Sequence, residues 1–101
     1  MSTSTSRRHF HKDPDAVLDW EFDWRKEWLP DSDSITNAEI LVSPTEANGG
    51  VVVDSTTFNG DTVICYLSSG TVGVDSDVTC RITTSEGRIN DWTIRIRIRE
   101  K

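Results

Sequence analysis

The sequence predicts an all-β domain: an immunoglobulin-like β-sandwich of six to seven short antiparallel strands, preceded by a flexible N-terminal arm. Two observations carry this prediction. In the run from Asp91 to Arg99, apolar side chains alternate strictly with threonine and arginine, which is the period of a half-buried strand. Short apolar segments also recur along the chain with turn signals every roughly 8–12 residues, a spacing typical of sandwiches.

Residues 1–12 are predicted to form the flexible basic arm, and residues 13–101 the sandwich domain. The arm opens with serine and threonine and shows no hydrophobic periodicity. Its basic and aromatic side chains are Arg7, Arg8, His9, Phe10, His11 and Lys12. The tripeptide Asp13-Pro14-Asp15 then favours a turn at the entry to the first strand.

Residues 17–24 alternate apolar and acidic side chains, which favours a strand, although Trp20, Trp24 and Trp28 are also spaced as one face of a helix. We predict a strand through Trp24 and then a single helical turn that ends before Pro30. The tryptophans are expected to belong to the core rather than to a ligand cage.

The middle of the chain is divided by turn signals at Asn48-Gly49-Gly50 and Asn59-Gly60-Asp61. Between these turns, β-branched and aromatic residues predominate. The strands predicted there cover residues 35–42, 51–54 and 62–67, and a further strand runs from Val74 or Asp77 to Thr83.

The last two strands are predicted to form an antiparallel hairpin over residues 77–84 and 90–99. The register that places apolar side chains opposite one another implies a three-residue loop, Glu86-Gly87-Arg88, with Gly87 at positive φ. The resulting partners are Ile82 with Trp92, Cys80 with Ile94, Val78 with Ile96, Thr79 with Arg95, and Asp77 with Arg97.

Two cysteines, Cys65 and Cys80, lie between apolar neighbours and are predicted to be buried, reduced thiols. They match no metal-site spacing. The His9-Phe10-His11 pair could hold a metal only where copies meet on a symmetry axis, and an ordinary basic arm is the preferred interpretation. No cofactor is expected.

The net charge of −6 disfavours general affinity for nucleic acid. No apolar run approaches the roughly 20 residues that a membrane span needs, and the polar start lacks a secretory signal, which favours cytosolic synthesis. The sequence contains no phosphate-binding glycine loop and no nucleophile elbow, and both of its histidines lie in the arm. We therefore expect no enzymatic activity.

Two rows of like charge have matched spacing. Asp19, Glu21 and Asp23 form an acidic row on one predicted strand. A basic row on the last strand consists of Arg95, Arg97 and Arg99. The two rows are expected to meet, either within one chain or across a subunit boundary; if they do not, at least one of them is a docking surface.

Two parts of the chain carry a recognisable pattern. The first is the opening from Lys12 to Asp19, with Asp23-Trp24 and Trp28-Leu29. The second is the stretch 67–73 with residues 78–84 and Gly87-Arg88. Both parts resemble small virion proteins of tailed bacteriophages, the phage fiber-tail adaptor-like family with an immunoglobulin-like domain. The resemblance covers roughly residues 12–99.

The resemblance implies a non-enzymatic structural component of a phage virion, made in the bacterial host cytoplasm, that joins or attaches to parts of the tail, fiber or head-tail region. Its expected partners are other virion proteins, including copies of itself in a symmetric oligomer, and neither nucleic acid nor membrane. Capsid decoration is an alternative, and a carbohydrate- or host-surface-binding module is an alternative of another class. The residues expected to bind partners are Arg7, Arg8, His9, Phe10, His11, Lys12, Arg95, Arg97 and Arg99.

Overall fold

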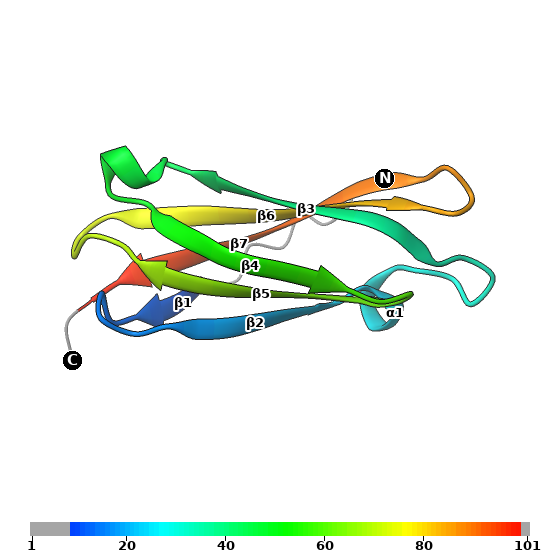
Figure 1. Ribbon diagram of the computed structural model, residues 1–101, viewed down its shortest axis with the longest axis horizontal. Coiled ribbons are helices and arrows are strands. Elements are labelled where there is room, and N and C mark those ends of the chain that lie inside the picture. The colour runs from blue at the N-terminus through cyan, green and yellow to red at the C-terminus, as the bar shows by residue number, and fades with distance from the viewer. Residues whose placement is uncertain (1–8, 100–101) are drawn as a thin grey trace.

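In the computed structural model, residues 9–99 are described, and they form two β-sheets packed face to face (Figure 1). One sheet has the strand order β1-β7-β6-β3 and the other β2-β5-β4, which confirms the predicted all-β class. The strands are β1 (His9–Lys12), β2 (Leu18–Asp23), β3 (Ile35–Ser43), β4 (Val51–Phe58), β5 (Thr62–Ser69), β6 (Asp75–Thr84) and β7 (Ile89–Ile98).

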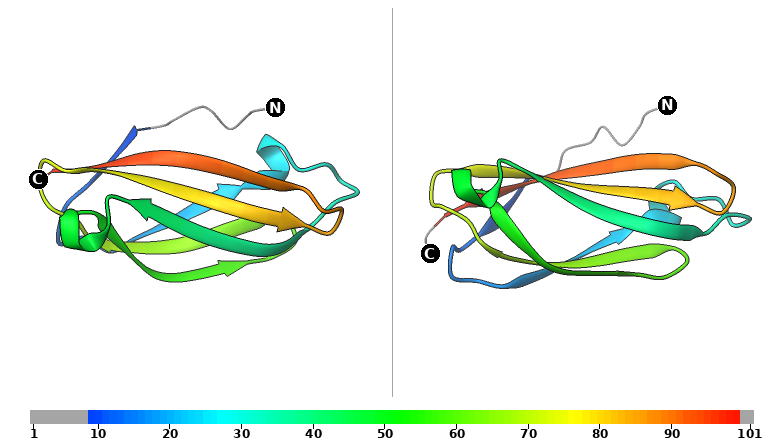
Figure 2. Two further views of the ribbon diagram at one scale, coloured as in Figure 1. Left: turned by 90° about the horizontal axis from the view of Figure 1, so that it is seen from above. Right: turned by 45° about the horizontal axis from the view of Figure 1, so that its top comes forward.

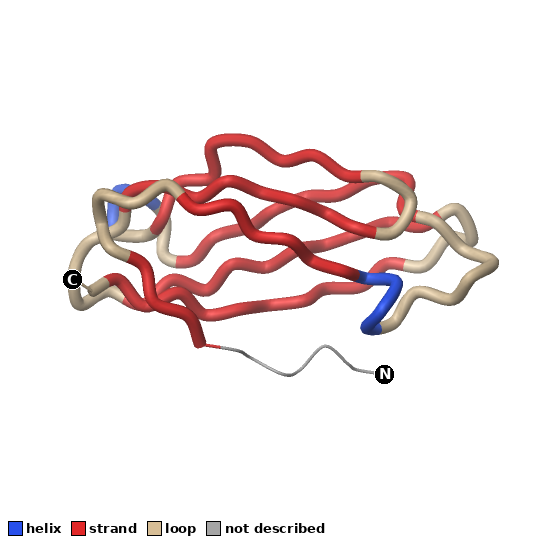
Figure 3. Tube along the Cα trace, turned by 90° about the horizontal axis from the view of Figure 1, so that it is seen from below, coloured by secondary structure: helices blue, strands red, loops and turns tan. Residues whose placement is uncertain are grey.

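Two short helical segments lie at opposite ends of the sandwich (Figure 3). The helical turn α1 (Trp24–Glu27) follows β2, as predicted, and Asp23 caps it by accepting a hydrogen bond from the Lys26 amide. The 3-10 turn η1 (Glu46–Asn48) links β3 to β4. Figure 2 shows the long strands of both sheets running along the long axis of the molecule.

The N-terminal boundary differs from the prediction, because His9–Lys12, assigned to the flexible arm, forms strand β1. It pairs with β7 in parallel, with His9 opposite Arg95, so the strands are not all antiparallel as expected. The pattern that indicates this strand is short: Phe10 and Lys12 face inward, while His11 between them is exposed. Residues 1–8, the rest of the predicted arm, lie outside the described residues.

The core lies between the inner faces of the two sheets. It includes Val63, Cys65 and Leu67 of β5, and it continues along the alternate residues of β6 and β7. Aromatic rings fill the end next to α1, where Trp92 meets Trp24 and Phe22 edge-to-face, each at a centroid distance of 5.3 Å.

The three tryptophans predicted for the core differ in their burial. Trp24 is fully buried, and its indole N–H donates to Cys80 Sγ at 3.4 Å. Trp20 is half-buried against Phe10, and Trp28 stays exposed at the far side of Trp24. The helical turn therefore brings Leu29, rather than Trp28, into the core.

The hairpin of β6 and β7 forms as predicted, but its register is two residues away from the predicted one. Val78 lies opposite Ile94 and Cys80 opposite Trp92, with Arg95 beside Asp77. A shift of two residues keeps every side chain on its predicted face, because side chains alternate with period two. Apolar matching favours the predicted register, because in the observed one Ile82 lies opposite Asn90 and Ile96 opposite Ser76.

The turn chemistry selects the observed register. The loop is Ser85-Glu86-Gly87, in which the Gly87 amide donates to the carbonyl of Thr84. The φ of Gly87 is positive, as predicted, with a value of 84°. This is the three-residue hairpin loop in which glycine occupies the left-handed third position. The predicted loop has the same length but would place Gly87 second.

Asp33 fixes this loop from the side. It is buried, and its carboxylate accepts hydrogen bonds from the Ser85 hydroxyl at 2.9 Å, the Glu86 amide at 3.1 Å and Arg88 at 2.7 Å. Burial alone would raise the pKa of Asp33, but these bonds and one from Thr84 outweigh it and hold the pKa well below its ordinary value.

Both cysteines are fully buried free thiols, as predicted. They lie on different sheets, Cys65 on β5 and Cys80 on β6. Burial raises the pKa of Cys65 to about 11 and that of Cys80 to about 12, so neither is a thiolate near neutral pH.

Burial of Ile94 in the inward row of β7 predicts that its truncation destabilises the fold strongly. Ile94→Ala should lower the free energy of unfolding by about 2–5 kcal/mol, because the lost apolar contacts leave a cavity in a closely packed core. The matched control is Ile89→Ala on the same strand, where the side chain is 67% exposed and the expected loss is below about 0.5 kcal/mol. Urea melts of both variants measure the difference; equal losses would contradict the assignment.

The Asp33 network predicts a pH-dependent contribution to stability. Because its folded pKa is lowered, Asp33 stabilises the fold fully above the pKa of an unfolded aspartate, about 3.9, and the contribution is lost as pH falls below that. Asp33→Asn should therefore lower the thermal midpoint by roughly 4 °C or more at pH 7, and by less at pH 2–3. Thermal melts across this range test it, with exposed Asp31→Asn as the control that should leave the curve unchanged.

Candidate docking surfaces

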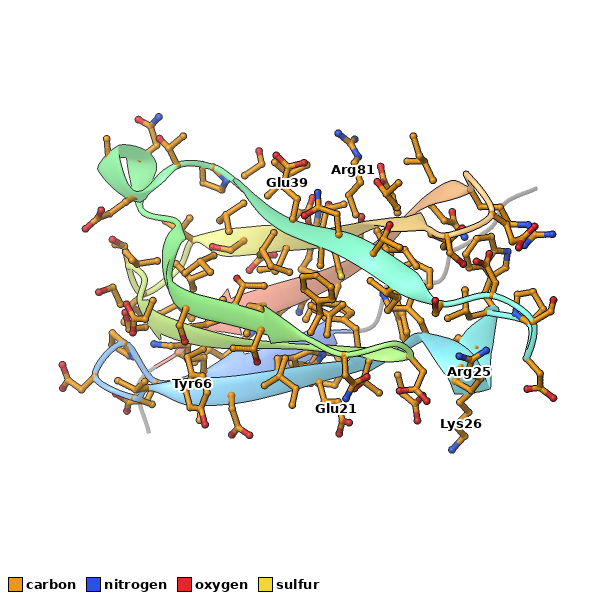
Figure 4. All side chains as sticks on the ribbon, turned by 45° about the vertical axis from the view of Figure 1, so that its right-hand side comes forward. Glu21, Arg25, Lys26, Glu39, Tyr66 and Arg81 are labelled. Carbon is orange, nitrogen blue, oxygen red and sulfur yellow. The ribbon has the colours of Figure 1, made fainter. Side chains whose placement is uncertain are left out.

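The two sheets turn their charged side chains in opposite directions. Figure 4 shows Glu21 and Tyr66 projecting from the sheet β2-β5-β4 and Glu39 and Arg81 projecting from the other sheet. We call the first the acidic face, made by the outer side chains of β2 and β5: Asp19, Glu21, Ile64 and Tyr66. We call the second the paired face, made by the outer side chains of β1, β7, β6 and β3.

The paired face holds the arginine row, but its charges are largely neutralised by β6. Arg95 donates from Nε to Asp77 Oδ1 at 2.9 Å and from its terminal nitrogen to Oδ2 at 3.3 Å. The hydrogen bond to Asp77 raises the pKa of Arg95 above its ordinary value. Asp75 lies 3.8 Å from Arg97 Nε and 3.9 Å from Arg95.

The same cross-strand pairing continues along the face. Arg81 donates twice to Asp91, at 2.8 and 3.0 Å, and the hydroxyls of Thr79 and Thr93 lie 2.8 Å apart. Each of these pairs joins one β6 side chain to its cross-strand neighbour on β7, so the paired face carries little unopposed charge. Arg99, at the end of the arginine row, is exposed.

The basic residues near the N-terminus separate into different environments. Lys12 is only 1% exposed, and its amine donates to the carbonyls of Ser69 at 2.6 Å and Asp13 at 2.9 Å. Burial lowers the pKa of Lys12, against the opposing effect of the nearby charges of Asp13, Asp15 and Asp54. Lys12 therefore ties β1 to the end of β5, and is not an exposed basic side chain of an arm.

Phe10 also faces inward, with its ring centroid 3.9 Å from that of Trp20. His11 is exposed on the paired face, opposite Arg97 in the register. His9 lies opposite Arg95, and Arg7 and Arg8 lie outside the described residues. Of the predicted N-terminal contact residues in the described part, His11 is thus the one shown with an exposed side chain.

The acidic row does not meet the arginine row within the chain. The intrachain alternative does not hold, because β2 and β7 belong to different sheets and their outer side chains point away from each other. A match across a subunit boundary stays a prediction. Among residues 9–99, no cation lies within ion-pair distance of Asp19 or Glu21.

Exposed apolar side chains accompany these carboxylates. Tyr66 is 46% exposed and lies opposite Asp19 in the register, and half-buried Ile64 lies opposite Glu21. Neither Ile64 nor Tyr66 is among the partner-binding residues predicted from the sequence. The signal was present, because Val63, Cys65 and Leu67 alternate inward and so place Ile64 and Tyr66 on the outer face.

Within residues 9–99, no three His, Cys, Asp or Glu side chains gather where they could hold a metal ion. The same part of the chain contains no helix of the length and hydrophobicity that a membrane crossing requires.

The described residues thus form a β-sandwich with one neutralised face and one acidic face that carries exposed apolar side chains. Residues 12–97 match the family described as podophage GP4 fiber-tail adaptor protein gp77, and the chain belongs to this family. No curated protein matches the chain at a significant level. Membership of a fiber-tail adaptor family supports a structural adaptor role in the phage virion.

The structure of the N-terminus predicts two different effects of truncation. Deleting residues 2–11 removes Phe10 and most of β1, and should lower the thermal midpoint by roughly 4–8 °C for each kcal/mol of packing lost. Deleting only residues 2–8 leaves every described contact in place and should keep the midpoint close to that of the full chain. Calorimetry of the two truncated chains makes the comparison, and equal midpoints would contradict a structural role for β1.

Proposed function

We propose that this protein joins a tail component to a fiber component of the phage particle, and that it binds one of them through the acidic face. The observation that carries the proposal is the contrast between the two faces. Arg95 and Arg97 lie beside aspartates of their own chain, whereas Asp19 and Glu21 have no cation partner among the described residues.

The composition of the acidic face suits a protein interface. Tyrosine is enriched at binding hot spots because it contributes a large rigid surface with a polar tip, and Tyr66 projects from the central strand of its sheet. Carboxylates at its margin attract a basic partner surface and fix its orientation. The proposed partner surface is therefore basic, with a recess for the tyrosine ring.

A second contact is needed for a protein that joins two others. We assign it to Arg7 and Arg8, which precede the described residues, together with His11 and Arg99, which are exposed. The Arg99 amide donates to the Lys12 carbonyl at 2.9 Å, so this end of β7 is close to β1. A symmetric ring of copies on the tail is part of the proposal, since repeated weak contacts gain from multivalency.

The carbohydrate-binding alternative receives little support from the tryptophans. Trp24 is buried, Trp20 lies half-buried against Phe10, and Trp28, 37% exposed, packs edge-to-face against Trp24, so these three rings form no broad exposed platform. No described feature favours capsid decoration over the adaptor role, and the family description names the fiber and the tail.

The acidic face predicts the outcome of a charge reversal. Asp19→Lys with Glu21→Lys should reduce incorporation into particles at least roughly tenfold, while the thermal midpoint changes little because both side chains are exposed. The matched control reverses two exposed carboxylates elsewhere, Glu39→Lys with Glu46→Lys, for the same change in net charge. Quantitative immunoblots of purified particles measure occupancy.

Two results would contradict the proposal. Wild-type occupancy of the Asp19 and Glu21 variant would remove the acidic face from the attachment. An equal loss in the control variant would show that only net charge matters.

A further inference from the structure

One edge of β7 is only partly covered in the described structure. Strand β1 lies beside its second half, from Arg95 to Ile98, and no strand among residues 9–99 lies beside residues 89–94 on that edge. The parallel pairing with β1 shows that this edge accepts a strand. An uncovered length of the same edge has the geometry for another one.

Along β7, the backbone N–H and C=O groups of successive residues point alternately toward β6 and toward the opposite edge. Thr79 and Thr93 form a non-hydrogen-bonded cross-strand pair, the kind in which facing side chains come closest, and their hydroxyls are in contact. The Arg99 amide, six residues further on, donates to β1. The Thr93 N–H therefore points to the open edge, and the N–H of Asp91 on the same edge is already bonded to Asn90 Oδ1 at 2.9 Å.

A groove of about 260 Å³ lies directly beside this edge, on the open side of the sandwich. Apolar side chains line part of it: Phe10, Trp20, Trp92 and Ile94. All four come from strands on either side of the gap between the sheets, β1 and β7 on one and β2 on the other. An apolar groove beside a strand edge that no described strand covers offers both a side-chain recess and a backbone partner.

Charged side chains line the rest of the groove. Glu21, Asp23 and Glu27 contribute three carboxylates, against the single amine of Lys26. None of the described ion pairs involves Glu21 or Glu27. The groove thus joins an aromatic floor to a rim with a surplus of negative charge, which favours an occupant with a basic side chain next to an apolar one.

We propose that this groove and the open edge of β7 bind an extended basic segment of another virion protein, which adds to the sheet as a strand beside Thr93. The inference rests on the proposed function and defines the chemistry of one partner. Backbone hydrogen bonds to the β7 edge hold the segment, an apolar side chain enters the aromatic floor, and an arginine or lysine lies across the carboxylates of the rim.

The edge can be tested with a pair of variants at Thr93. Thr93→Pro removes the N–H that points to this edge, and no backbone bond to β6 is lost because that N–H does not face β6. The substitution also removes the hydroxyl contact with Thr79 of β6. Thr93→Val is the matched control, since it loses the same hydroxyl contact but keeps the N–H and the size of the side chain. We expect Thr93→Pro to lower particle occupancy at least tenfold and Thr93→Val to leave it unchanged, with both variants checked for folding by circular dichroism.

A photocrosslink identifies the occupant. A benzophenone amino acid at position 26, in place of Lys26, removes the one amine of the rim and so leaves a basic occupant undisturbed. Irradiated particles should yield a crosslink to a segment of another virion protein that contains arginine or lysine. A crosslink to residues 1–8 of the same chain, to a second copy, or to no protein at all would overturn the proposal. This test remains decisive even if Thr93→Pro fails to fold.

The two proposals fail separately. If reversal of Asp19 and Glu21 abolishes incorporation while Thr93→Pro and the crosslink have no effect, the acidic face is the attachment surface and the groove is not. If the protein is absent from particles altogether, the adaptor function itself fails.

Discussion

The inward row of β7 is the constraint on which the rest of this structure depends. Ile94, Ile96 and Ile98 are buried between the two sheets, and Trp92 meets the aromatic end of the core. Because side chains alternate along a strand, burying this row fixes where every arginine of β7 points. The charged outer surface is therefore a consequence of how the core is filled, and β6 supplies the aspartates that make such a surface tolerable in a folded domain.

Neutralisation on one side leaves the opposite side to determine the electrostatic character of the molecule. The chain has 17 acidic and 11 basic residues, and a part of the basic set is engaged with neighbouring carboxylates. The acidic row of β2 therefore dominates its own face, where Tyr66 provides the apolar contact area. A division of this kind lets a small domain present two electrostatically distinct surfaces.

The sequence was sufficient for the features that depend on alternation, and insufficient for those that depend on spatial partners. It predicted the strands, the buried cysteines and the faces of the last hairpin, because period two is visible in the residues themselves. It missed the hairpin register by two, since that depends on Gly87 taking the third loop position and on Asp33, distant in sequence, holding the loop. It also left β1 in the arm, because a four-residue strand offers only Phe10 and Lys12 as its pattern.

The parallel pairing of β1 with β7 has a mechanical consequence. The chain enters β1 beside Arg95 and leaves β7 beyond Ile98, at the other end of the same short ladder. Tension applied along the chain from its two sides therefore pulls the strands lengthwise past each other and loads their hydrogen bonds together. An antiparallel pair at this place would open one bond at a time, like a zipper. A domain that couples a fiber to a tail would in this way resist stretching more strongly than its modest size suggests.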